Sequence, residues 1–417
     1  MQDIKYLIYI YIVSYCQNSH NMLVIFMKKN YAILLIWIFL TSTAPFIFFR
    51  WPGHPYKILT FISLLIMCLH LVFKNKLFID KRLLFVISIQ ISYYIVLSLF
   101  YNDISNINLA VQLISLYISI VFILNFGGPQ IFANSFVLVI LYMGLGGTSS
   151  FFYHLLFGIE PFFRVEYGND VSYFLGLTTS NVFINIGDLR VIRYAGFFDE
   201  PGTYGLFASF ALILNRIYIK SNKYDFFIIV FGIFTFSLAF YVASFLYLLF
   251  FYFHFKTLKY LLLSFFFISI MYTFITLNNT ESYLKLYEIS IGRLEDSQNG
   301  LSTSNRGGLM DFDLSSFLNN PIFGVGPKKF VAGANIFAVP AKYGIIGMLF
   351  FYSFLIWIFI LLIVKNFSFF YLKLVTILLL SLFHRPELSS VFTLIFLYLV
   401  IFSLRDKYNL SFKIFDK

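Results

Sequence analysis

Long apolar runs separated by short polar breaks fill the chain from residue 31 to residue 404. A bilayer hydrocarbon core about 30 Å thick needs roughly 20 apolar residues per helix, and most runs approach that length. The runs lie at residues 31–49, 58–73, 83–101, 108–126, 131–157, 203–219, 225–240, 242–255, 260–277, 343–364, 369–383 and 389–404. The pattern predicts an all-α, polytopic integral membrane protein with about 12 transmembrane helices, within a range of about 10 to 13.

The apolar stretch at residues 225–255 is divided in two in this prediction. As one straight helix its roughly 31 residues would extend about 47 Å, well beyond the hydrocarbon core. We therefore expect a tight hairpin near Tyr241.

The basic residues lie mostly in short blocks between the apolar runs. These blocks are Lys28-Lys29, Lys74–Lys76, Lys81-Arg82, Lys220–Lys223, Lys256–Lys259, Lys365 and Arg405–Lys407. Because lysine and arginine are enriched in cytoplasmic loops, the blocks place both termini in the cytoplasm. Two long polar stretches, residues 158–202 and 278–342, then fall on the outer face. Since the blocks account for much of the formal net charge of +11, no nucleic-acid partner is predicted.

The composition agrees with a chain embedded in lipid. Hydrophobic residues make up 60% and charged residues 12% of the 417 residues, which is too little polar material to cover a water-soluble surface. We predict one polytopic membrane domain at residues 27–417. Residues 1–26 form an N-terminal extension in this prediction, because a spanning helix there would place Lys28 and Lys29 outside. Met27 is then the expected start of translation.

The first outer stretch ends in a cluster of charged residues and glycines. Arg190, Arg193 and Gly196 precede Glu200 and Pro201, which open the next apolar run. Proline suits the first turn of a helix, and a carboxylate is stabilised at the positive end of the helix dipole. The cluster is therefore open to two interpretations: a helix cap with interfacial arginines, or a site for an anionic substrate.

A second cluster lies in the other outer stretch, which carries Arg293 and Arg306. A short helix is predicted after Arg306, and we expect it to lie on the membrane surface because its apolar residues share a stripe. The stripe consists of Met310, Leu314, Phe317 and Leu318. Gly324 and Gly326 follow this helix.

A third cluster, His384-Arg385, lies between the last two apolar runs and could equally sit among lipid headgroups. No metal or cofactor is predicted. The aspartates of Asp311-Phe312-Asp313 would diverge by about 200° on a helix, and the histidines show no ligand spacing. Phosphate-binding and dinucleotide-binding motifs are also missing from the sequence.

Four sequence segments carry a resemblance to a known family. They are Arg193-Tyr-Ala-Gly196-Phe-Phe-Asp-Glu200-Pro201, Phe236-Ser237-Leu238, Asn320-Pro321-Ile322-Phe323-Gly324-Val325-Gly326 and Tyr343-Gly344-Ile345-Ile346-Gly347. In their order and spacing between membrane helices they resemble the O-antigen polymerase (Wzy-type) family of bacterial glycosyltransferases, within the wider group that includes O-antigen ligases. The likeness covers most of the chain as topology, and roughly residues 190–220 and 305–350 as sequence.

The resemblance implies a polysaccharide polymerase of the bacterial inner membrane whose active site faces the periplasm. Such enzymes join oligosaccharide repeat units held on polyprenyl diphosphate. The growing chain passes to a sugar hydroxyl of the next unit, and the diphosphate carrier leaves. The implied partners are the polyprenyl-diphosphate-linked oligosaccharide, the lipid bilayer, a chain-length regulator and a flippase.

Under this resemblance the catalytic candidates are Glu200, Arg193, Arg306 and His384. Arginine offers a permanent cation whose donors match phosphate oxygens. A carboxylate or an imidazole can take the proton of the acceptor hydroxyl, with Glu200 as the first candidate and His384 as the second. The substrate-binding candidates are Arg190, Arg293, Arg385, Gly196, Gly324 and Gly326.

Two alternatives stay open. An O-antigen ligase would use the same donor with another acceptor. A flippase or exporter of the lipid-linked oligosaccharide would need ionisable residues or broken helices near the middle of the bilayer. The polar groups of this sequence gather instead at one membrane face, which favours an enzyme with its site there.

Overall fold

The computed structural model describes residues 30–50, 55–157, 161–167, 170–186, 189–253, 306–326, 335–364, 368–384 and 390–406. The expectations for residues 1–26 and Met27, the predicted span at residues 260–277, and the site candidates Arg293 and Arg385 lie outside these ranges.

The described residues are mostly helical. The helices are Asn30–Thr41, α2 (Pro55–Val72), α3 (Lys81–Tyr101), α4 (Ser105–Phe122), α5 (Pro129–Phe157), α6 (Pro201–Leu214), α7 (Asn222–Ile233), α8 (Leu238–Phe251), α12 (Arg306–Asn319), α13 (Ala338–Phe351), α14 (Ser353–Val364), α15 (Phe369–His384) and α16 (Val391–Asp406). A 3-10 turn, η1 (Ile47–Arg50), and two π turns, η2 (Ile123–Gly127) and η3 (Asn215–Ile219), complete them.

Four stretches of helix within the described ranges are long and apolar enough to cross a membrane. They are Lys81–Tyr101, Asn106–Gly127, Pro129–His154 and Ala338–Val364. Five further apolar helices are shorter: Asn30–Thr41, Lys57–Val72, Leu238–Phe251, Phe369–Phe383 and Val391–Arg405. These helices are consistent with a membrane protein, and the count of about twelve spans stays a prediction.

The expectation of an all-α chain is wrong for the first outer stretch, which forms two small antiparallel sheets. The first sheet contains β1 (Phe163–Tyr167), β2 (Asp170–Phe174) and β3 (Thr179–Ser180), and the second contains β4 (Val182–Ile186) and β5 (Leu189–Arg193). Valine, isoleucine and aromatic residues alternate with polar ones in these segments, as half-buried strands require. Mean hydropathy alone does not detect so short a pattern.

The long apolar stretch near residue 240 does turn back, but earlier than expected. α7 ends at Ile233 and α8 begins at Leu238, so the turn precedes Tyr241 by several residues. Phe236 takes a left-handed conformation (φ 51°) there, which no helix interior accepts. The hydroxyl of Tyr241 donates to the carbonyl oxygen of Ile233 over 2.7 Å and closes the hairpin.

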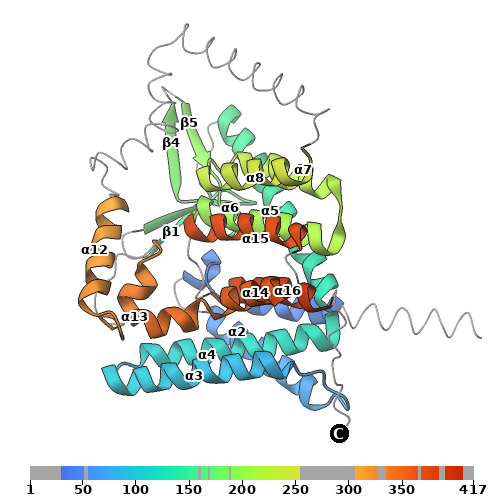
Figure 1. Ribbon diagram of the computed structural model, residues 1–417. Coiled ribbons are helices and arrows are strands. Elements are labelled where there is room, and N and C mark those ends of the chain that lie inside the picture. The colour runs from blue at the N-terminus through green and yellow to red at the C-terminus, as the bar shows by residue number, and fades with distance from the viewer. Residues whose placement is uncertain are drawn as a thin grey trace, which may run out of the picture.

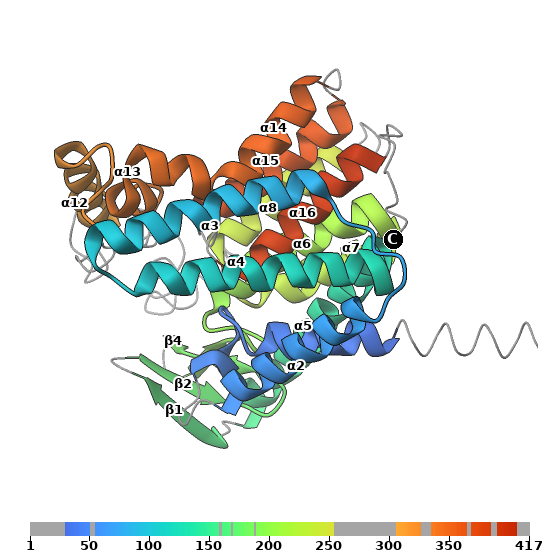
Figure 2. The ribbon, with the colours of Figure 1, turned by 90° about the horizontal axis from the view of Figure 1, so that it is seen from below.

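Most helices run side by side, with α12 and the strands at the same end of the bundle (Figures 1 and 2). We call this the strand end, and the opposite end the basic end. At the strand end α3 finishes at Tyr101, α6 begins at Pro201 and α15 finishes at His384. At the basic end α3 begins at Lys81 and α16 finishes just after Arg405.

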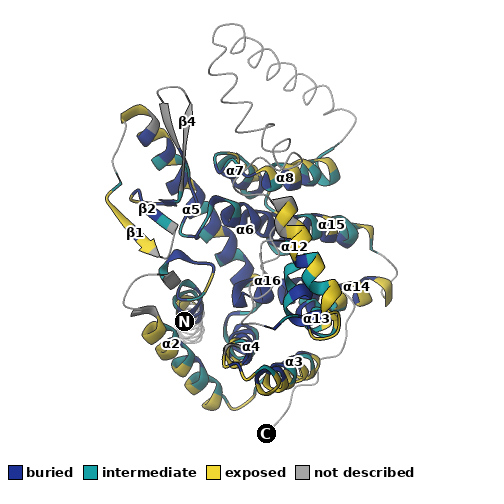
Figure 3. Cartoon of the chain, turned by 90° about the vertical axis from the view of Figure 1, so that its left-hand side faces the viewer, coloured by how far each residue is buried: buried dark blue, intermediate teal, exposed yellow. Residues whose placement is uncertain are grey.

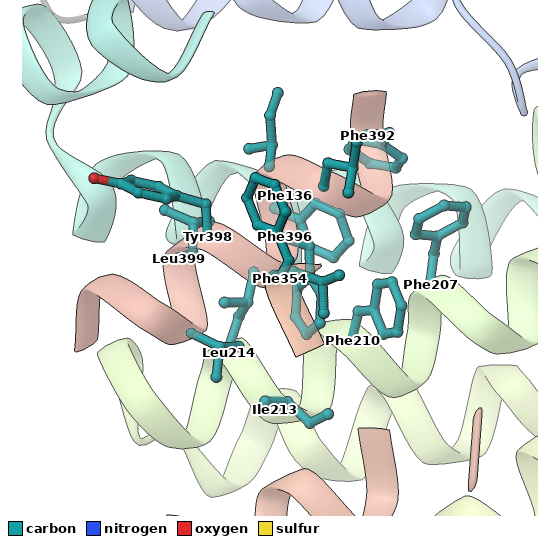
Figure 4. Packing of buried hydrophobic residues seen from close by; sticks show 14 of the residues in the cluster. Phe136, Phe207, Phe210, Ile213, Leu214, Phe354, Phe392, Phe396, Tyr398 and Leu399 are labelled. Carbon is teal, nitrogen blue, oxygen red and sulfur yellow. The ribbon is translucent and has the colours of Figure 1, made fainter. Parts of the chain in front are cut away.

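Helix α6 forms the centre of the molecule. Every residue from Thr203 to Leu214 is buried, and Figure 3 shows this helix in dark blue among its neighbours. Phenylalanine rings fill the space between α6 and α16: Phe210 stacks on Phe396 with ring centroids 3.8 Å apart, and Phe207 lies 4.6 Å from Phe392 (Figure 4). A helix without a polar face is suited to such a buried position.

Polar groups at the basic end lock helix termini together. Asp80 caps α3 by accepting from the backbone N–H of Arg82 over 3.1 Å, and its other oxygen accepts from Arg405 and from Tyr398 of α16. All three side chains are buried. A charge buried in this way persists only because it is paired and hydrogen-bonded.

Candidate functional site

The segment from Arg193 to Gly196 is fixed by a run of hydroxyl residues. Ser180 donates to the carbonyl oxygen of Arg193 over 2.8 Å. The N–H of Gly196 donates to the hydroxyl of Thr178 over 3.0 Å, and its carbonyl oxygen accepts the N–H of Thr179 over 2.7 Å. Gly196 has a φ of 63°, which glycine adopts without strain. The glycine therefore makes the turn that leads from β5 toward α6.

The guanidinium of Arg193 holds the turn between α7 and α8. Its Nε donates to the carbonyl oxygen of Thr235 over 3.1 Å and its Nη2 to that of Phe236 over 2.9 Å. These carbonyl groups follow the last turn of α7, where helices leave acceptors unsatisfied. Two of the five donors of Arg193 thus have a structural task.

The two acids before α6 have different surroundings. Asp199 is buried, and its carboxylate accepts from the hydroxyl of Thr203 over 2.8 Å. Glu200 occupies the N-cap position, with Pro201 in the first turn, but its half-buried side chain accepts no capping bond from the described helix. Asp199 thus contacts the first turn of α6 through the hydroxyl of Thr203, and Glu200 holds the N-cap position without a side-chain cap.

A small cavity joins the start of α6 to the end of α15. Gly202 and Gly205 of α6 line it together with Phe240 of α8 and Ser381 of α15. His384, the last residue of α15, follows Ser381 by three positions, about one helical turn nearer the strand end. The structure thus brings the start of α6, which directly follows the first sequence cluster, close to the last turn of α15.

Two of the described helices, α6 and α8, start beside this cavity, and α16 also starts at the strand end. α6 begins at Pro201, α8 at Leu238 and α16 at Val391. The N–H of Thr393 donates to the hydroxyl of Ser390, which caps α16, over 3.1 Å. Helix N-termini carry partial positive charge and unsatisfied N–H donors. Together with Arg193 they make this end favourable for an anion.

The second cluster forms a separate corner of the strand end. Arg306 is the first residue of α12, which packs on α13. The predicted apolar stripe is not uniform: Met310 is 37% and Leu318 66% exposed, while Leu314 and Phe317 are half-buried. Buried Asp313 accepts from the side-chain amide of Asn335 over 2.7 Å, a contact that the stripe did not anticipate. Whether α12 lies on the membrane surface stays a prediction.

Gly324 lets two chain segments pack backbone to backbone, and Gly326 lies against the ring of Tyr101. Gly344 breaks α13 with φ 66° and ψ −170°. The carbonyl groups released by the break accept from Val325 (2.8 Å) and Gly326 (3.1 Å), and Ile345 donates to Pro321 over 2.8 Å. A Cβ atom on Gly324 would lie 2.4 Å from the carbonyl carbon of Lys342.

These glycines therefore have a packing role, and their role in substrate binding stays a prediction. The same holds for Arg190, which pairs through its backbone with Asn185 in the second sheet. Within the described ranges no cluster of His, Cys, Asp and Glu residues could hold a metal ion. Sequence reasoning missed the anchoring residues Thr178, Thr179 and Ser180, although three consecutive hydroxyl residues before a strand are a visible signal.

Comparison of this chain with known proteins gives no support to the family resemblance. No protein-family model, no curated protein and no solved structure matches this chain.

Proposed function

We propose that this protein is a polysaccharide polymerase that joins oligosaccharide repeat units carried on polyprenyl diphosphate, at the outer face of a bacterial inner membrane. The observation that supports the proposal is that the segment from Arg193 to Glu200 leads directly into α6, whose first residues line a cavity together with the start of α8 and the last turn of α15. Apolar helices surround this place, so a lipid-linked substrate could reach it from the bilayer.

The proposed chemistry follows from the charges at the strand end. The departing polyprenyl diphosphate carries several negative charges, which the positive helix N-termini and the arginines stabilise as they develop. Glu200 takes the proton from the acceptor hydroxyl, with His384 as the second candidate. The glycosidic bond forms as the bond to the diphosphate oxygen breaks, and no metal or nucleotide takes part.

An extension assay with purified protein tests this function. Carrier-linked repeat units should be converted into a ladder of longer glycans without added metal or nucleotide, and Glu200→Gln protein should leave the single unit unchanged. A protein that folds normally and binds the unit but never extends it would rule out the polymerase.

A second candidate function is export of the lipid-linked oligosaccharide. The break in α13 is the observation that supports it. A helix interrupted by irregular backbone is a feature of transporter binding sites. Here the break at Gly344 is satisfied by the segment before α13. Reconstituted vesicles separate the two candidates, because an exporter moves the single unit across the bilayer without lengthening it.

A further inference from the structure

A second cavity lies between α3, α4, α13 and α16, away from the site described above. Its volume is about 30 Å³. It is lined by Gln90, Tyr94, Leu109, Gln112, Leu113, Phe351, Val391 and Leu394. Measured along the helices, Gln90 lies about 17 Å from the strand end of α3, and Gln112 about 11 Å from that of α4. Both depths fall inside a hydrocarbon core about 30 Å thick.

Gln90 presents a buried oxygen that needs a donor. The side chain is only 4% exposed, and its amide nitrogen donates to the carbonyl oxygen of Phe350 over 2.7 Å and to the hydroxyl of Ser353 over 2.6 Å. A carbonyl oxygen only accepts, so the orientation of the amide is fixed. Its own oxygen has no hydrogen-bond partner among the described residues. An amide buried without a partner costs about 1 to 3 kcal/mol.

Further polar groups face the same cavity. Tyr94 brings a hydroxyl and Gln112 a carboxamide, and Val391 places the first turn of α16 at its wall. Lipid chains can satisfy none of these groups. A cavity that holds a water molecule needs at least about 10 to 15 Å³ and two to four polar partners, and both conditions are met.

We propose that this cavity is a hydration site which carries water from the strand end into the membrane-embedded part of the protein. Water supplies the donor that Gln90 lacks and bridges it to Gln112 and Tyr94. The start of α16 gives the route, because it connects the cavity wall with the strand end. This inference is independent of the proposed polymerase activity.

Cysteine accessibility tests the proposal. Leu109→Cys puts a thiol at the cavity wall, and Val111→Cys puts one on the exposed side of α4, about 3 Å away in depth. Both are made in full-length protein with Cys16 and Cys68 replaced by alanine. A charged, water-soluble methanethiosulfonate should modify Leu109→Cys at least tenfold faster than Val111→Cys in membranes, because the thiolate needs water to form and react.

A third variant links the labelling to the polar lining. Gln90→Leu should reduce the labelling rate of Leu109→Cys at least tenfold. If Gln90→Leu protein does not accumulate, Gln112→Leu serves, since Gln112 makes no hydrogen bond in the described part of the chain. Three results would overturn the hydration site. They are equal labelling rates at the two cysteines, no labelling of either cysteine, and a labelling rate of Leu109→Cys that stays the same when the glutamine is replaced. A membrane-permeant maleimide on unfolded protein confirms that each cysteine is present.

Discussion

Neighbouring residues of one motif have separate tasks in this protein. In the segment from Arg193 to Pro201, Gly196 makes a turn, Asp199 binds a hydroxyl and Arg193 anchors another hairpin. Glu200 stands at the N-cap position of α6 and makes no side-chain capping bond to that helix. A sequence motif alone cannot separate these tasks, because every one of them uses an ordinary polar residue.

Replacing Glu200 by glutamine should abolish glycan extension and leave the protein stable. The amide keeps the size of the side chain but cannot act as a base, so the rate should fall by about 100-fold or more. The free energy of unfolding should change by less than about 0.5 kcal/mol, because no cap is lost. Gel analysis of surface glycans and thermal unfolding in detergent measure the two effects.

Thr203→Val is the matched control for Glu200→Gln. It removes the hydrogen bond to Asp199 and should cost about 1 kcal/mol of stability, while extension continues. If Glu200→Gln produced wild-type chain lengths, Glu200 would not be the base.

Replacing Arg193 should lower stability as well as activity. Arg193→Ala removes two hydrogen bonds to the α7–α8 turn from a charged donor, and we expect a loss of about 1.5 to 3 kcal/mol. Arg193→Lys keeps the charge but not the fork of donors, so it should be destabilised too. Arg164, whose exposed side chain pairs with Glu166, is the control: Arg164→Ala should change stability by less than about 1 kcal/mol. A fully stable Arg193→Lys protein would show that the turn does not need the guanidinium.

At the scale of elements, the sequence predicts the approximate positions of the helices. It does not predict the residues at which they end. Periodicity and length found α3, α4 and α5, because lipid and protein both demand apolar side chains there. The β-hairpins were not predicted because mean hydropathy does not detect such short strands, and the break at Gly344 was not predicted because it depends on contacts with the segment before α13. The contact between α6 and α15 likewise could not be predicted, because the sequence of an apolar helix does not indicate which other helix it packs against.

The break in α13 gives a stability prediction with an internal control. Gly344 and Gly128 both have positive φ, at 66° and 82°. A Cβ atom at residue 128 would meet nothing within 4 Å, whereas at residue 344 it would lie 2.1 Å from the carbonyl oxygen of Ile322. Gly128→Ala should therefore cost about 1 kcal/mol, and Gly344→Ala about 3 kcal/mol or more. Similar unfolding temperatures for the two variants would contradict this packing.

The buried ion pair between Asp80 and Arg405 at the basic end predicts that a single substitution will strongly lower the stability of the protein. Asp80→Asn still caps α3 but removes the carboxylate that pairs with the buried Arg405, which should cost about 3 to 5 kcal/mol. The double variant Asp80→Asn, Arg405→Met should recover part of this loss, because it no longer buries a lone charge. Protein yield and thermal unfolding in detergent measure both, and a single variant as stable as the wild type would show that Arg405 finds other partners.

At the scale of the whole molecule, the strand end and the basic end differ in the way that a membrane protein with sidedness requires. The candidate groups Arg193, Glu200 and Arg306 belong to elements of one end, as the alternation of apolar runs predicts. The lysine-rich breaks at Lys74–Lys76 and Lys220–Lys223 belong to the other. Alternation fixes which residues share an end, but which end faces outward rests on charge alone.

Labelling of single cysteines in intact cells decides the orientation. Leu177 is 49% exposed beside the first sheet at the strand end, and Asn75 is exposed in the loop before α3 at the basic end. In protein free of native cysteine, a membrane-impermeant maleimide should modify Leu177→Cys in intact spheroplasts and Asn75→Cys only after the membrane is opened. The proposed joining of carrier-linked units requires a site on the outer face, so the reverse pattern would place Glu200 in the cytoplasm and contradict the proposed polymerase. The expected pattern would leave the ligase and the exporter as rivals, because both are compatible with the same orientation.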